Sequence, residues 1–354
     1  MKNKFLTLAR NEIVNLEAYT PAIRDAKIIV NANENNWGLA ESVLEDICKA
    51  VRGANRYPDS TNTRLREILA SNFHLCPENF IVSNGLDGFF TMFCRAFLSP
   101  DDNIIVSDCT FSVYATNAKI SGSSVITVPL REDYSQNLDD FYNAIKPNTK
   151  AIFYCNPNNP TGLAVSLGEI EKFLGKLPNN IFFILDEAYI EFSDLPQAES
   201  FKLLEKFDNL VICRTCSKIC ALAGLRIGYS AMHPDLANVI SLVRETYCVS
   251  QIAEVAACSF FSQPDLIEKI REDVREGRNM LERALRSKGI KFLPSCTNFV
   301  YIMPNDKEAK ILHSVFDEHS IAVRFFGSSG QESVRVTIGT QDEMKKIVEA
   351  IREA

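Results

Sequence analysis

The sequence of 354 residues has no uninterrupted apolar run approaching membrane-spanning length, and its first residues, MKNKFLTLARNEIV, lack the apolar core of a signal peptide. It also lacks an excess of basic residues, because its formal net charge is −7, which argues against a nucleic-acid surface. No repeat, low-complexity stretch or flexible Gly/Ser linker interrupts it. These absences favour a globular, cytoplasmic, enzyme-sized protein with no membrane or nucleic-acid partner.

Cysteine is abundant, but the spacing of the cysteines does not indicate a disulfide framework. Eleven cysteines are scattered along the chain, and without a signal peptide they indicate free, mostly buried thiols rather than disulfides. Three of them, Cys213, Cys216 and Cys220, lie in RTCSKICALAGLRIGYS (214–230) or just before it. A structural zinc site needs four ligands, and no second CxxC pair occurs; an iron–sulfur cluster would need Cys213 and Cys216 on one face, whereas a strand separates them. The segment is therefore read as a lysine site, with no metal.

Apolar runs alternate with amphipathic stretches over most of the chain. The alternation predicts an α/β fold with a mostly parallel sheet flanked by helices. Expected strands begin at FIV (80), NIIVS (103), SVITV (124), KAIFYC (150), IFFIL (181) and LVICR (210). A helix is predicted over 39–53, with Leu39, Val43, Leu44, Ile47 and Val51 on one face, and another over 63–73.

The order of predicted helices and strands changes after about residue 250. A long charged helix (266–289), strands at NFVYIM, IAVRF and SVRVTI, and a final helix at 342–354 predict a smaller α/β domain. We expect an N-terminal arm at 1–30 that packs with the small domain or a partner subunit, a large domain at 31–250 and a small domain at 251–354.

Polar side chains follow several of the predicted strands. Asp186 ends one strand in ILDEAYIEF, and NPNNPTG (156–162) presents side-chain amides after another. NGLDGFF (84–90) combines a strand end, a glycine turn and a helix start, which is the geometry that binds phosphate. After the last strand, Thr215, Ser217 and Arg226 surround Lys218, an arrangement that predicts an anion pocket beside an amine.

These motifs together resemble a known family. NPNNPTG, LDEAYIEF, Ser-Lys with an arginine eight residues on, TNFVYI and VRVTIGT, in this order and spacing, resemble the fold-type I, class II aminotransferases that use pyridoxal phosphate. With NANENNWG, RYPD and the SK…LAGLR run, the chain is most similar to the histidinol-phosphate aminotransferases. The resemblance extends over nearly the whole chain and implies a large domain with a mostly parallel sheet, a smaller C-terminal domain and a homodimer.

The resemblance implies roles for the residues around the cofactor. Lys218 would bind pyridoxal phosphate covalently as a Schiff base and shuttle protons, and Asp186 would keep the pyridine nitrogen protonated. Asn159 and Tyr189 would contact the ring's phenolic oxygen, and Phe111 would stack on the ring. The groups implied to hold the cofactor phosphate are the backbone of Leu86 and Asp87, the hydroxyls of Thr215 and Ser217, Arg226, and Tyr57 from the partner subunit.

The resemblance also implies residues that contact the substrate. Arg335 would clamp either the α-carboxylate of glutamate or the phosphate of histidinol phosphate, and Arg324 with Tyr19 would add contacts favouring phosphate. Asn33 and Tyr247 are further expected substrate contacts. The sequence departs from the family where Gly88 replaces an acidic residue, where Phe111 replaces tyrosine, and where Thr246 replaces a proline before Tyr247.

Three functions remain open at the level of sequence. The first is transamination between histidinol phosphate and 2-oxoglutarate, giving imidazole-acetol phosphate and glutamate in histidine biosynthesis through a ping-pong cycle. Its runner-up within this first class is an aromatic or other amino-acid aminotransferase of the same fold. A threonine-phosphate decarboxylase-like lyase would usually show threonine at 217 and proline at 223, where this chain has Ser217 and Ala223. A non-catalytic or metal-binding relative is the third class.

Overall fold

The centre of the molecule is a large, mostly parallel sheet, seen in a computed structural model that describes residues 5–14, 16, 25–196, 199–328 and 331–354. In these described residues the sheet has seven strands in the order β2-β8-β7-β6-β5-β3-β4, and only β8 runs antiparallel to its neighbours. The strands are β2 (Phe80–Ser83), β3 (Asn103–Ser107), β4 (Ser124–Val128), β5 (Thr149–Cys155), β6 (Phe182–Asp186), β7 (Leu210–Thr215) and β8 (Gly228–Met232).

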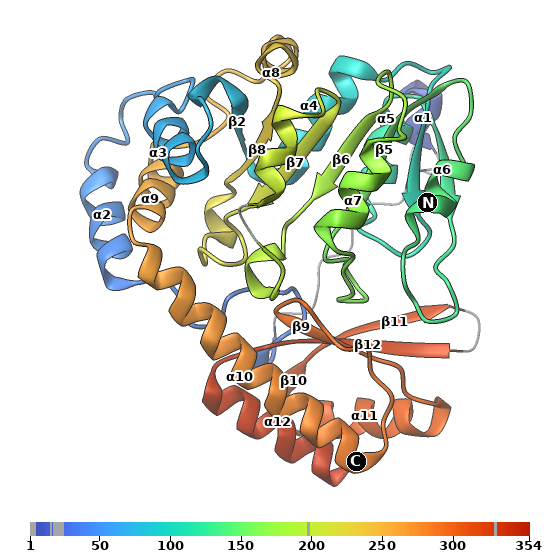
Figure 1. The fold of residues 1–354 in the computed structure, drawn as a ribbon. Helices are drawn as coiled ribbons and strands as arrows, with labels where there is room; N and C mark the ends of the chain where they lie inside the picture. Colours follow the sequence, from blue (N-terminus) through green and yellow to red (C-terminus); the bar gives the residue numbers. More distant parts are fainter. Residues whose placement is uncertain (1–4, 15, 17–24, 197–198, 329–330) are drawn as a thin grey trace.

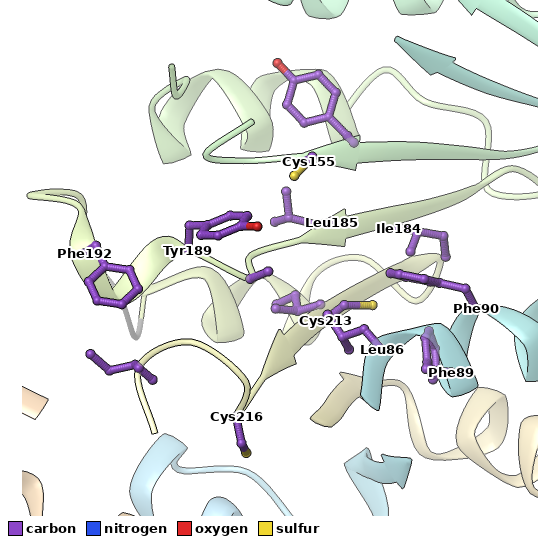
Figure 2. Packing of buried hydrophobic residues seen from close by; sticks show 14 of the residues in the cluster. Leu86, Phe89, Phe90, Cys155, Ile184, Leu185, Tyr189, Phe192, Cys213 and Cys216 are labelled. Atoms are coloured by element: carbon purple, nitrogen blue, oxygen red, sulfur yellow. The ribbon is translucent and has the colours of Figure 1, made fainter. Parts of the chain in front are cut away.

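Both faces of this sheet are covered, which explains the continuous apolar runs of its strands. Every residue of β7 is buried. On one face of this strand Cys213 lies beside Leu86 of α4 (Gly85–Phe97), as Figure 2 shows. On the other face Arg214 donates to Ser200 Oγ of η4 (Glu199–Glu205). The helices of this layer are α2 (Glu41–Val51), α3 (Thr63–Phe73), α4 (Gly85–Phe97), α5 (Val113–Ile120), α6 (Leu138–Asn143), α7 (Leu167–Leu174), α8 (Pro234–Ser241) and α9 (Gln251–Phe261).

A second, smaller unit contains an antiparallel sheet with helices on one side (Figure 1). Its strands β9 (Phe299–Ile302), β11 (Arg324–Ser328) and β12 (Gln331–Thr337) pair in the order β11-β12-β9, and β1 (Ile28–Ile29) pairs in parallel with β10 (Ile321–Ala322). Its helices are α10 (Pro264–Lys288), α11 (Asp306–Glu318) and α12 (Gln341–Glu353), of which α10 and α12 pack together.

Short turns of helix complete the description. They are α1 (Asn11–Val14), η1 (Leu6–Leu8), η2 (Pro77–Asn79), η3 (Ile190–Phe192), η4 (Glu199–Glu205) and η5 (Ala223–Leu225). The segment containing α1 lies against α5, where the Arg10 guanidinium donates to the carbonyl of Ile120 at 2.9 Å. None of the helices in the described residues is both long and apolar enough to span a membrane.

The six strands predicted in the large sheet are confirmed, and so is the α/β fold class. The predicted helix at 39–53 is found as α2. Of the residues predicted to share one face, Val43 is buried, whereas Leu39, Leu44 and Val51 are exposed. The reason is that α2 packs mainly against the single helix α9, which covers only a narrow strip of it.

Two further differences concern strands. Strand β8 was not predicted from the sequence. Its residues GYSAM include small and polar side chains, so they do not form a continuous apolar run. The strand expected at IAVRF is divided into β10 and β11, because residues 321–322 pair with β1 and residues from 324 onward pair with β12.

The division into an arm (1–30), a large domain (31–250) and a small domain (251–354) stays a prediction. Contacts of α9, which begins at Gln251, run mainly to α2 and α3 of the large layer. These contacts favour a boundary after α9 rather than before it.

Candidate active site

A cavity of about 580 Å³ lies where the ends of the central strands meet residues of the smaller sheet. Strands β5, β6 and β7 are in register near their ends, since Cys155 pairs with Asp186, and Asp186 pairs with Cys213, which lies two residues before the end of β7. The residues that follow these strands therefore reach one place. Thirteen of the predicted site residues line the cavity: Asn33, Leu86, Asp87, Phe111, Asn159, Asp186, Tyr189, Thr215, Ser217, Lys218, Arg226, Arg324 and Arg335.

Lys218 stands in the turn that follows β7 and extends its amine into the cavity. Its Nζ donates to the carbonyl oxygen of Ala32 at 2.9 Å. Burial, together with the cationic Arg335 and Arg226, lowers the pKa of Lys218 to about 8, against the opposing effect of Glu34 and Asp87. About a tenth of the amine is therefore neutral, and nucleophilic, at pH 7, far more than for a lysine in water.

Asp186 is the last residue of β6 and is almost completely buried. Its Oδ1 accepts the backbone N–H of Ala188 at 3.0 Å, and its Oδ2 accepts the hydroxyl of Tyr114. Burial raises the pKa of Asp186 to about 6, and the two donors oppose that rise. A carboxylate held in this way can keep a proton on a basic nitrogen that faces it.

The hydroxyl of Tyr189 is held by amides from two sides. Asn33 Nδ2 lies 3.1 Å and Asn159 Nδ2 3.2 Å from this oxygen, and both amides donate to it. Asn159 in turn accepts from Arg335 Nη1 through its Oδ1 at 2.5 Å. The chain of contacts joins the NPNNPTG loop, the turn after β6 and strand β12, so these groups are oriented before any ligand binds.

The start of α4 forms a cradle for an anion. Gly85 has φ +67°, and a Cβ there would collide with the guanidinium of Arg226. No side chain caps this helix, so the N–H groups of its first turn remain available beside Leu86 and Asp87. Arg226 contributes charge and lies 3.4 Å from Ser217 Oγ and 3.6 Å from the Asp87 carboxylate.

Two arginines face each other on the small sheet. Arg324 of β11 and Arg335 of β12 are directly paired in register, and both line the cavity. Their guanidinium carbons lie 5.8 and 5.6 Å from the ring centroid of Phe326, which lies in the same cavity wall. Like charges directly opposite on neighbouring strands are unfavourable, so this pair indicates a site for an anionic ligand.

The residues of the cavity fit pyridoxal phosphate. The α4 cradle and Arg226 suit a dianionic phosphate, Asp186 suits a protonated ring nitrogen, and Lys218 is an amine of lowered pKa. Phe111 lines the same cavity and offers an aromatic face.

Two of the described residues predicted for the site do not line the cavity. Tyr57 and Tyr247 stack on each other at 4.6 Å between ring centroids on the surface, 82% and 41% exposed, outside the residues that line the cavity. Tyr19 lies outside the described residues. The roles predicted for all of these side chains stay predictions.

The three cysteines in and beside RTCSKICALAGLRIGYS (214–230) belong to the packed interior. Cys213, Cys216 and Cys220 are buried, and burial raises the pKa of Cys213 and of Cys220. In Figure 2, Cys213 lies beside Leu86, whereas Cys216 lies apart from it in the turn after β7. Among the described residues, no group of three or more His, Cys, Asp or Glu side chains gathers where a metal could bind.

Sequence reasoning missed some residues around the cavity. Phe326 lies two residues after Arg324, and the period of a strand could have placed both on one face. Glu34 directly follows Asn33, but a single acid in a polar segment gives no signal of its own. Tyr114 belongs to α5 and has no signal in its local sequence, because it contacts Asp186 only in the folded protein.

Comparison with known proteins points to one family. The model of the family "Aminotransferase class I and II" matches residues 25–351. Histidinol-phosphate aminotransferase 2 of Pasteurella multocida is 34% identical over 324 residues, which cover 91% of this chain and 88% of the relative. The histidinol-phosphate aminotransferase of a Geobacillus species is also 34% identical, with 90% and 88% covered.

Solved structures agree with these sequence matches. The histidinol-phosphate aminotransferase of Sinorhizobium meliloti, crystallised with pyridoxal 5′-phosphate, superposes with a TM-score of 0.86 at 26% identity, covering 93% of this chain and 91% of that one. The L-threonine-O-3-phosphate decarboxylase of Porphyromonas gingivalis shares the fold, with a TM-score of 0.78 at 20% identity over 92% and 98% of the two chains.

Proposed function

Because the chain belongs to the aminotransferase class I and II family, whose pyridoxal-phosphate chemistry it uses, we propose that it transfers an amino group between histidinol phosphate and 2-oxoglutarate. Relatives carrying the name histidinol-phosphate aminotransferase, 31 to 34% identical over about nine-tenths of the chain, support this choice of substrate.

The observation that carries the proposal is the opposed pair Arg324 and Arg335. A monoanionic carboxylate needs one bidentate guanidinium, whereas a dianionic phosphate can be bound by two. Arg324 and Arg335 come from the small sheet, whereas Arg226 lies just before β8 of the large sheet, so the cavity offers separate sites for two phosphates, one from the cofactor and one from the substrate.

Each remaining group has a task in this proposal. Bound pyridoxal phosphate supplies an electrophilic carbon for the amino group and a ring that withdraws electrons. Lys218 holds the cofactor and moves a proton at the substrate carbon that carries nitrogen, and Asp186 keeps the ring nitrogen protonated. Asn159 and Tyr189 orient the ring through its phenolic oxygen, and Arg335 fixes the substrate so that this carbon faces the Lys218 amine.

The active unit in this proposal is a homodimer. Tyr57 is 82% exposed and Leu242 84% exposed, and the exposed apolar residues Val51 and Tyr247 lie close to them in the chain. Surface residues of this kind indicate contact with a second molecule. In the dimer, Tyr57 reaches the cofactor phosphate of the partner subunit, while small molecules remain the ligands of the cavity.

The test is a comparison of kcat/KM for histidinol phosphate, phenylalanine and O-phosphothreonine with 2-oxoglutarate as acceptor. Histidinol phosphate should exceed phenylalanine by about a hundredfold, since the phosphate adds charge-assisted hydrogen bonds. A preference for phenylalanine would overturn the substrate in favour of an aromatic aminotransferase. Release of carbon dioxide from O-phosphothreonine without an acceptor would overturn the reaction type.

A variant separates the phosphate contact from general damage. Arg324→Gln should lower kcat/KM for histidinol phosphate roughly ten- to a hundredfold. It should change kcat/KM for glutamate by no more than about threefold. Arg286→Gln, on the exposed side of α10, is the matched control and should leave both values unchanged. Equal losses for the two substrates would contradict the role proposed for Arg324.

A further inference from the structure

The feature that carries a further inference is the environment of Asp186 on the side away from the cavity. Tyr114, in the first turn of α5, is completely buried, and its hydroxyl donates to Asp186 Oδ2. It does not line the cavity. The contact joins α5 to the end of β6, two elements that are 72 residues apart in the sequence.

The ring of Tyr114 is fixed on several sides. Phe90 of α4 and Phe111 meet it edge-on, with centroids 5.0 and 5.6 Å away, and Phe153 of β5 stacks on it at 5.2 Å. A ring packed in this way cannot rotate away from its acceptor. The hydroxyl therefore stands at one place, and Asp186 is held by it.

We propose that Tyr114 is a positioning residue that fixes the orientation and the ionised state of Asp186 and thereby places the proton on the ring nitrogen of the cofactor. The proposal rests on the role proposed above for Asp186. With Oδ1 bound to Ala188 N–H and Oδ2 to Tyr114, the plane of the carboxylate is set by donors from two elements.

The charge balance around Asp186 explains why such a donor is needed. Burial disfavours the carboxylate form, and Asp87 and Glu187 act in the same direction. The neighbouring groups Cys155, Cys213 and Tyr189 are all protonated at neutral pH, since burial raises the pKa of each. Tyr114 and Ala188 N–H are the donors that favour the charged form, and the pKa of Tyr114 itself is raised by burial and by Asp186, so the phenol keeps its proton.

Phe111 connects the two ends of this arrangement. It lines the cavity and meets the Tyr114 ring edge-on. Tyr114 thus supports both the predicted stacking residue and the carboxylate. Losing the hydroxyl alone should disturb only the carboxylate, because phenylalanine keeps the ring.

The experiment titrates the cofactor-free protein with pyridoxal phosphate and compares Tyr114→Phe with wild type. At pH 6.5 the dissociation constant should rise roughly ten- to a hundredfold, the value of a hydrogen bond to a charged acceptor, and the ratio to wild type should shrink at pH 8.5, where Asp186 ionises without help. With cofactor labelled by ¹⁵N in the ring, the resonance should move toward the unprotonated value in Tyr114→Phe.

Two controls distinguish the possible failures. Tyr154→Phe removes an equally buried hydroxyl, on β5, that lies 3.4 Å from the Gln136 carbonyl, and it should change neither quantity. Asp186→Asn should weaken cofactor binding more than Tyr114→Phe. If Asp186→Asn binds cofactor normally, the role of Asp186 is wrong; if it binds weakly while Tyr114→Phe has wild-type affinity and resonance, only the inference about Tyr114 is overturned.

Discussion

Lys218 shows how much of the chemistry depends on one side chain and its surroundings. A lysine in water is almost entirely protonated at pH 7, but burial lowers the pKa of Lys218 to about 8 and the cations Arg335 and Arg226 contribute to this shift. The same arginines that suit anionic ligands therefore also make the amine more reactive. A substitution of Arg335 or Arg226 should therefore change both the binding of anionic ligands and the pKa of Lys218.

The lowered pKa of Lys218 predicts the pH dependence of cofactor capture. Only the neutral amine attacks, so the rate at which cofactor-free protein binds pyridoxal phosphate covalently should rise about tenfold per pH unit between pH 6 and 7 and level off above roughly pH 8.5. Stopped-flow absorbance in the near visible measures this rate, with butylamine as the reference amine. A rate that still climbs steeply from pH 9 to 10 would show an ordinary lysine, and Lys218→Ala should give no signal.

At the scale of elements, the turn between β2 and α4 depends on one glycine. Gly85→Ala would place a methyl group against the Arg226 guanidinium and would require a positive φ. We expect the affinity for pyridoxal phosphate to fall at least about tenfold, because the cradle loses its geometry. A titration of the cofactor-free variant measures the loss.

Gly88, one turn further along α4, supplies the matched control. A Cβ at this position would meet the Cβ atoms of Asn84 and Ser83 at 3.6 and 3.9 Å, which are ordinary contacts. Gly88→Ala should therefore leave cofactor affinity within about twofold and raise the free energy of unfolding by up to about 1 kcal/mol, as alanine favours helix. Equal losses in both variants would contradict the steric argument for Gly85.

A buried ion pair joins β7 to the segments that follow β6. Arg214 donates from Nε and Nη2 to Glu187 Oε2 at 3.0 and 2.8 Å, and its Nη1 lies 3.5 Å from Glu191. Arg214→Ala would leave these acids buried without their partner, so we expect the free energy of unfolding to fall by about 3 to 5 kcal/mol. Urea unfolding measures the change.

The control for Arg214 is a salt bridge of similar length on the surface. Lys206 lies 2.7 Å from Glu171, and both side chains are largely exposed. Lys206→Ala should therefore lower the free energy of unfolding by no more than about 1 kcal/mol. A loss of the same size in both variants would mean that burial of the Arg214 pair is not what stabilises it.

The elements also show what a sequence can and cannot predict here. Buried parallel strands leave continuous apolar runs, so β3, β5, β6 and β7 could be located from the sequence, and so could the polar residues at their ends; β4 was located by its β-branched residues, although only Val128 of this edge strand is buried. The position of β8 could not, because its pairing between β2 and β7 depends on the tertiary fold rather than on its own composition. Tyr114 was missed for the same reason: an α5 tyrosine meets Asp186 only once the sheet is assembled.

At the scale of the whole molecule, the surface around α2 matters most. Leu44 and Val51, which belong to the apolar face predicted for this helix, are exposed, and Tyr57 follows them in the chain. In a single chain these apolar side chains stay exposed to water, and Tyr57 does not line the cavity of its own chain. Both observations support the proposal that a second subunit covers this surface and receives Tyr57.

The dimer proposal predicts complementation between two defective chains. Tyr57→Ala should weaken cofactor binding roughly tenfold, and Lys218→Ala should abolish activity. Co-expressed with different tags and purified as heterodimers, the two variants form one site that keeps Lys218 from one chain and receives Tyr57 from the other. At limiting pyridoxal phosphate, such heterodimers should reach about half the wild-type activity per dimer, as one of two symmetric sites is intact.

The reference for this experiment is the heterodimer of wild type with Lys218→Ala, which also has one intact site and should match it in activity and cofactor affinity. If Tyr57 instead served its own chain, the only site with a lysine would lack the hydroxyl, and the heterodimer would bind cofactor as weakly as Tyr57→Ala alone. A protein that sediments as a monomer while fully active would exclude the shared site altogether, since Tyr57 does not line the cavity of its own chain.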